Sequence, residues 1–187
     1  AAACEEGLSE APVGQGVSAV AAVYMGGESR LHIPGTYFTH VALGMPGPSR
    51  SAVANVVKHC MALRGVSAFT SSSLIGVYGT SPASDAGTMF ESLKGSLATP
   101  SADIIKRAKA LAKAEACLGL ENGSQALAVA MTKGVLESGS FGGVSAAYDA
   151  VSEKDVTDAF VIMQTSNPSL AAVGDLSYVP YHASILA

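Results

Sequence analysis

The chain has 187 residues, of which 49% are hydrophobic and only 14% are charged. This length suits one domain with a sizeable core, and an average soluble domain carries about 25% charged residues. So little charge predicts a surface that a partner covers, while a net charge of −4 with mostly scattered Lys and Arg argues against nucleic-acid binding.

The N-terminal stretch is predicted to hold a flexible arm, a strand and a turn. Residues 1–16 show no hydrophobic periodicity and are acidic without arginine, unlike a transit or signal peptide. "VSAVAAVY" (17–24) predicts a buried strand because it is continuously apolar. "MGGESRLHIPG" (25–35) is expected to turn the chain, with Gly26 and Gly27 supplying backbone freedom.

A second strand and a helix follow. "YFTHVALGM" (37–45) combines aromatic and β-branched residues, which favours a strand. Ser49 is expected to cap a helix over residues 50–63. The apolar residues of that helix recur at helical spacing and define its buried face: Val53, Val56, Val57, Cys60 and Met61.

The segment "SAFTSSSLIGVYGT" (67–80) raises the question of a nucleophilic serine. It lacks the GxSxG pattern of a nucleophile elbow, and its residues alternate as in strands. We therefore interpret it as one or two strands, with Ser71–Ser73 on the polar face or in the turn. Leu74, Val77 and Tyr78 are then candidate core or interface residues.

Helices dominate the middle of the chain. Residues 83–98 place an apolar stripe on one face: Ala86, Met89, Phe90, Leu93 and Leu97. Ser101 is a predicted N-cap for the helix over 102–120, and Asp103 adds a negative charge to its first turn. A further helix is expected over about 124–137, followed by a glycine-rich loop at 139–143.

The C-terminal part alternates short elements with stop signals. A short helix is expected at 144–151 and another at 153–165, which Ser152 and Asp155 begin as a capping box. "LAAVG" (170–174) predicts the last strand. The order of elements predicts an α+β lobe over residues 17–187, with a mixed or antiparallel sheet of about five to six strands packed against helices.

The residue types that commonly act in catalysis, metal binding or nucleotide binding form no recognisable motif in this sequence. The four histidines (His32, His40, His59 and His182) show neither HExxH nor HxxEH spacing, and the glycines form neither GxGxxG nor GxxxxGK[ST]. The three cysteines (Cys4, Cys60 and Cys117) are odd in number and form no CxxC pair. We therefore predict no catalytic residue, no metal ligand and no cofactor.

One basic cluster stands out. Lys106, Lys109 and Lys113 recur at i, i+3 and i+7 and lie along one helix face, with Arg107 beside them. A solvated face is the simplest interpretation, and contact with an acidic partner or lipid headgroups is the sharper alternative.

Several stretches together resemble the mitochondrial processing peptidase and complex III core protein family, which is pitrilysin-like, with core protein 2 as the nearest branch. "SAFTSSSLIGVYGT" resembles its "AFN.SYSDSGLFGIY" stretch, and "YMGGESR" (24–30) resembles the "Y.GGE.R" that opens the C-terminal lobe of core protein 2. The "H.AL" strand recurs as His40, Ala42 and Leu43. "GSQAL" (123–127) and "AAVGDLSYVPY" (171–181) match further stretches in the same order.

The resemblance implies the C-terminal half of a protein built from two similar α+β lobes. The family's zinc motif belongs to the other lobe of the catalytic subunit, so the resemblance implies that this chain is not an enzyme. The processing-peptidase α-subunit carries a long glycine-rich loop after the helix that matches 50–63. Here that place holds only Leu63–Val66, which argues against presequence capture.

The expected role is therefore a structural core subunit of the mitochondrial cytochrome bc complex (respiratory complex III). It would be peripheral, on the matrix side of the inner membrane, with no transmembrane span and no bound nucleic acid. Its expected partners are the other complex III subunits, including a core protein 1 or processing-peptidase β-like chain, and a separate chain that supplies the N-terminal lobe. The alternative is the non-catalytic, α-like part of a processing peptidase that binds presequences.

Overall fold

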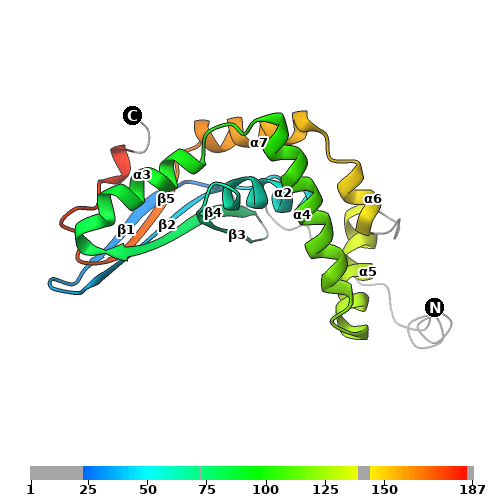
Figure 1. Cartoon of the computed structure of the whole chain (residues 1–187), viewed down its shortest axis with the longest axis horizontal. Coiled ribbons are helices and arrows are strands. Elements are labelled where there is room, and N and C mark those ends of the chain that lie inside the picture. Colours follow the sequence, from blue (N-terminus) through cyan, green and yellow to red (C-terminus); the bar gives the residue numbers. More distant parts are fainter. Residues whose placement is uncertain (1–22, 72, 139–143, 185–187) are drawn as a thin grey trace.

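The fold is that of a computed structural model, in which residues 23–71, 73–138 and 144–184 are described. A single mixed β-sheet carries helices on one face, and further helices gather at one end of the sheet (Figure 1). This arrangement confirms the predicted α+β lobe. The predicted arm (1–16) and the glycine-rich loop (139–143) lie outside the described residues.

The sheet has five strands in the order β1-β5-β2-β4-β3. β1 pairs with β5 in parallel, and the other neighbouring pairs are antiparallel. β5, near the end of the chain, therefore lies between the first two strands. The strands are β1 (Gly27–His32), β2 (Phe38–Pro46), β3 (Ser67–Ser71), β4 (Leu74–Pro82) and β5 (Ser169–Gly174).

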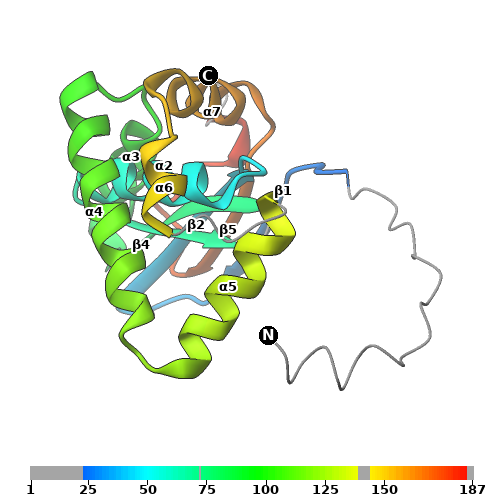
Figure 2. The ribbon, with the colours of Figure 1, turned by 90° about the vertical axis from the view of Figure 1, so that its right-hand side faces the viewer.

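Three helices cover one face of this sheet: α2 (Ser51–Ala62), α3 (Ala86–Ser96) and α7 (Glu153–Thr165). The short 3₁₀ helix η1 (Ala83–Asp85) leads into α3. The long helix α4 packs on α2, and α5 and α6 follow it at the same end of the molecule (Figure 2). Their bounds are α4 (Ala102–Leu120), α5 (Ser124–Ser138) and α6 (Val144–Asp149), and η2 (His182–Ser184) lies near the C-terminus.

The core lies between the sheet and these helices. Alternate residues of the central strands point into it, and they meet the buried face predicted for α2. Phe90 from α3 and Phe160 from α7 are the largest side chains that are fully buried. The strand residues of this core are Val41, Leu43, Met45, Ile75, Val77, Leu170 and Ala172.

Helix starts follow the predicted capping chemistry at two of three positions. Ser101 accepts a hydrogen bond from the Ile104 N–H, and Ser152 and Asp155 form the capping box of α7. Ser49 does not cap α2, because Arg50 occupies the cap position and makes no side-chain cap bond. The buried face of α2 supplies its stability instead, as is usual for helices in proteins.

The first strand of the described part of the chain begins at Gly27, within the segment predicted as a turn. Residues 17–22 of the predicted strand lie outside the described part, and Val23 and Tyr24 are not in a strand. The segment predicted as a turn instead contains β1 (Gly27–His32). Arg30, in the middle of β1, points to the helix-covered side of the sheet, where the carbonyls of the C-terminal tail bind its side chain. Gly26 makes the bend before β1 at φ +69°, where a Cβ would collide with Asn167.

Candidate interaction surface

The four histidines are held apart by separate contacts within the chain. Within the described residues, no group of three or more His, Cys, Asp or Glu side chains gathers as a metal site would require. Each imidazole has its own partner: His32 Nδ1 and Leu176 N (3.0 Å), His40 Nδ1 and the Tyr78 hydroxyl (2.6 Å), His59 Nε2 and Glu115 (2.6 Å), and His182 Nε2 and Pro168 O (2.6 Å).

The two described cysteines differ in environment. Cys60 is buried in the core, and burial raises the pKa of its thiol to about 11, although the nearby Arg64 charge opposes the rise. Cys60 is therefore a core residue without thiolate character at neutral pH. Cys117 is exposed on α4. Cys4 lies outside the described residues.

The basic cluster of α4 is largely committed to contacts within the chain. Lys109 donates hydrogen bonds to the carbonyls of Asp149 and Val151, and Lys113 lies 2.8 Å from the Asp149 carboxylate. The Lys113 hydrogen bond holds the pKa of Asp149 below its ordinary value. Two of the three lysines thus tie α6 to α4, a role that neither prediction for this face included.

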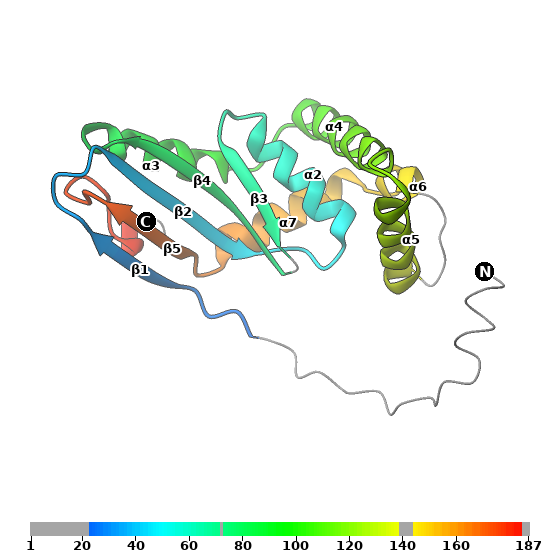
Figure 3. The ribbon, with the colours of Figure 1, turned by 90° about the horizontal axis from the view of Figure 1, so that it is seen from below.

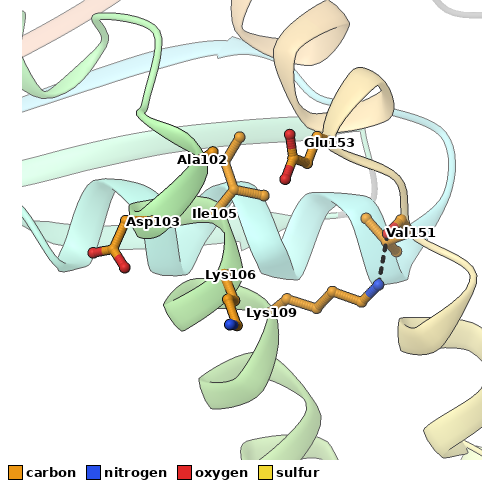
Figure 4. Close-up of a pocket in the computed structure, with 7 residues that line it drawn as sticks. All are labelled: Ala102, Asp103, Ile105, Lys106, Lys109, Val151 and Glu153. Atoms are coloured by element: carbon orange, nitrogen blue, oxygen red, sulfur yellow. Dashed lines mark hydrogen bonds between the residues drawn. The ribbon is translucent and has the colours of Figure 1, made fainter.

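A hollow of about 340 Å³ lies between the start of α4 and the start of α7 (Figure 4). Asp103, Lys106, Lys109 and Glu153 stand around it with Ile105 and Val151. The two lysines and two carboxylates offset each other, and Lys109 already donates to Val151 O across the hollow. The hollow therefore selects neither an anion nor a cation.

The face of the sheet opposite the core helices is the distinctive surface of the molecule. Viewed from below, the strands lie in front of the helices (Figure 3). We call this surface the open face. The strand pairing arranges its side chains in cross-strand rows, and no residue in these rows is Asp, Glu, Lys or Arg. The rows are Phe38–Pro82, Leu31–Val173–His40–Thr80, Ser29–Ala171–Ala42–Tyr78–Ser67, Gly27–Ser169–Gly44–Gly76–Phe69, and Pro46–Leu74–Ser71.

Large apolar side chains remain accessible on the open face. Leu31 is 57% exposed and Phe38 is 52% exposed, and four others are between 36% and 40% exposed: Val173, Tyr78, Phe69 and Leu74. Phe69 packs closely over Gly76, where a Cβ would collide with its ring. Leu74 and Tyr78 thus lie on a candidate interface, whereas Val77 is fully buried in the core.

The polar groups of the open face bond to one another. The Tyr78 hydroxyl, Thr80 Oγ1 and His40 Nδ1 lie within 3.0 Å of each other. Tyr24 reaches over the sheet and donates from its hydroxyl to Gly44 O at 2.8 Å. Ser67 and Ser71 are strand residues, which confirms the strand interpretation of this segment. Neutral groups that already have partners are cheap to desolvate, so the open face is suited to being covered by another protein.

Comparison with known proteins identifies the fold. No protein-family model matches the sequence, and no curated protein matches it. A chain of the solved complex III2 from Candida albicans with Inz-5 bound has a TM-score of 0.74 and 13% sequence identity. The match covers 95% of the present chain and 53% of that chain, so the present chain spans about half the length of its structural neighbour.

Proposed function

We propose that this chain is a non-catalytic structural subunit of complex III, peripheral on the matrix side of the mitochondrial inner membrane. In this proposal a second chain supplies the other lobe and covers the open face. Core protein 1 or a processing-peptidase β-like chain completes the assembly. Among the described helices, none has the length and apolar character needed to cross a bilayer.

The open face is the observation that most strongly supports the proposal. A lobe with an accessible, uncharged sheet face is poorly suited to isolation in water, because soluble monomers rarely leave large contiguous apolar patches exposed. The structural neighbour belongs to complex III2 and is about twice as long as the aligned region. A lobe that aligns with half of that chain and has an accessible, uncharged face fits an arrangement in which another lobe covers this face.

The non-catalytic character is supported by how the described histidines and carboxylates are used. His59 and Glu115 bind each other between α2 and α4, and Lys58 shares the same carboxylate at 2.7 Å. His40 belongs to the hydrogen-bonded group on the open face. These contacts position helices and strands, and they leave the imidazoles spread over different parts of the lobe.

Purification of an affinity-tagged chain from its own mitochondria tests the proposal. We expect cytochromes and an iron–sulfur protein to co-purify in stoichiometric amounts, with ubiquinol oxidation activity in the complex. Co-purification with a zinc peptidase subunit alone, together with chelator-sensitive presequence cleavage, would indicate the processing-peptidase alternative. Recovery of the chain from mitochondria without any co-purifying partner would refute both.

A further inference from the structure

We propose that the outer edge of β1 receives an extended segment of the partner that covers the open face, so that the sheet continues across the interface. This inference rests on the proposed function, because it assigns a second binding mode to the same partner. Its basis is the orientation of the β1 backbone and the unusual placement of the charged side chains of β1.

The hydrogen bonds at both ends of β1 fix which backbone groups face outward. Gly27 N–H donates to Pro168 O at 3.2 Å, and Ile33 N–H donates to Gly174 O at 2.8 Å. In a parallel pair, alternate residues turn both N–H and C=O toward the same neighbour. Gly27, Ser29, Leu31 and Ile33 therefore face β5. The backbone groups of Glu28, Arg30 and His32 face the outer edge, where the described strands place no neighbour.

Edge strands are commonly protected by charged side chains that discourage pairing with another chain. β1 contains such residues, but their side chains point to the helix-covered side of the sheet, where the C-terminal tail binds them. Arg30 donates from Nη1 to Pro180 O and from Nη2 to Val179 O, both at 2.9 Å. Its guanidinium carbon also lies 4.6 Å from the centre of the Tyr181 ring. Arg30 is thereby withdrawn from the edge that it would otherwise protect.

The side chains of Glu28 and His32, on either side of Arg30, are also bound by the C-terminal tail. Glu28 accepts from Arg30 at 2.9 Å and from His182 N–H at 3.4 Å, so its charge is paired on the helix-covered side of the sheet. His32 Nδ1 accepts from Leu176 N–H at 3.0 Å. The C-terminal tail thus fixes all three side chains whose backbones face outward. An incoming strand could therefore bond to the outward backbone groups of residues 28, 30 and 32, and no mobile charged side chain would block it.

The edge is continuous with the open face, which identifies the occupant. Ser29 and Leu31 of β1 form the outer ends of two rows of that face, and Leu31 is 57% exposed. A partner lying on the open face reaches β1 without crossing a charged rim. The segment it adds would place small or apolar uncharged side chains beside Ser29 and Leu31, and its main chain would bond to residues 28, 30 and 32.

Hydrogen exchange of single amides provides the direct test, using mass spectrometry with electron-transfer fragmentation. In the isolated chain, the amides of Ser29 and Leu31 should exchange slowly, because they bond to β5, and those of Glu28, Arg30 and His32 should exchange fast. In the purified complex, the outward amides should slow by at least about a hundredfold, as expected for amides that enter a stable ladder.

A proline substitution provides the second test. Glu28→Pro removes an outward N–H and leaves the bonds of β1 to β5 in place, as edge strands tolerate. Glu28→Ala is the matched control because it loses the same carboxylate contacts but keeps the N–H. We expect both variants to have similar melting temperatures when isolated. The proline variant should enter the complex about fivefold less than the alanine variant when each competes with wild type.

The outcomes separate this inference from the proposed function. If the chain is found in no complex, the proposed function fails and this inference fails with it. If the chain is in the complex but its outward amides still exchange fast, or Glu28→Pro enters as well as Glu28→Ala, this inference alone is wrong. Slow outward amides in the isolated chain would also overturn it, since the chain itself or a second copy would then occupy the edge.

Discussion

A single negative charge in the middle of the open face should block assembly and leave the isolated lobe folded. Ala171 is the position of choice, because it is exposed in β5 and its cross-strand neighbours are Ser29 and Ala42. These neighbours offer no cation to a carboxylate. An aspartate at this position is also too short to reach the rim of the sheet.

The free-energy cost of the substitution follows from the side chains and solvent around position 171. In the isolated chain, Ala171→Asp and Ala171→Asn should both cost up to about 1 kcal/mol, because both residues are poor strand formers on an exposed face. When a partner covers the face, the ion loses its water without gaining a counter-charge, which costs several kcal/mol. The uncharged amide of the same shape loses less. We expect Asp to weaken assembly by at least about 2 kcal/mol more than Asn, or roughly thirtyfold.

The assay is competition for a place in the complex. Each variant is expressed together with wild-type chain in the same cells, and mass spectrometry of the isolated complex gives the ratio of the two. Urea unfolding of the purified chains checks that both variants remain folded. If the Asp and Asn variants enter the complex equally well, the open face is not buried there and the reasoning is refuted.

Three further predictions concern the lobe itself. Ser152→Ala should lower the free energy of unfolding by about 1 kcal/mol in urea, because α7 loses its capping box; an unchanged midpoint would contradict this. Glu115 has a pKa below its ordinary value of 4.5, chiefly through the Lys58 hydrogen bond, so its contribution to stability is present above pH 4.5 and is lost as pH falls through the folded-state pKa. Glu115→Gln should therefore flatten the acid side of the stability profile, and an unaltered acid side would argue against this contact. Iodoacetamide at pH 8 should label Cys117 and leave Cys60 unmodified in the folded chain, as peptide mapping would reveal, because burial raises the pKa of Cys60 to about 11.

Sequence patterns predicted helices and strands correctly where one local feature, such as apolar spacing or a capping residue, determines the structure. The buried face of α2 follows from apolar residues at helical spacing, and α4 and α7 begin where Ser101 and Ser152 can accept hydrogen bonds. The strand pair of β3 and β4 follows from alternation within residues 67–80. These signals are local, so the sequence alone contains them.

The elements and contacts that were missed depend on distant parts of the chain. The segment of β1 is predicted as a turn from the backbone freedom of Gly26 and Gly27, and only the distant carbonyls of Val179 and Pro180 explain how a strand accommodates Arg30. The open face was foreseen only in part, through the low charge content and through Leu74 and Tyr78. Its rows depend on strand order, which no local pattern encodes.

The position of β5 has a consequence for synthesis. β5 lies between β1 and β2, and its register pairs Gly27 with Ser169, about 140 residues later. At ribosomal rates of about 5–20 residues per second, β5 is synthesised roughly seven to thirty seconds after β1. The hairpin of β3 and β4 and the helices that pack on it are made well before then. Completion of the sheet, and with it the edge and the open face, therefore comes after the other strands and requires the chain through β5 to have left the ribosome.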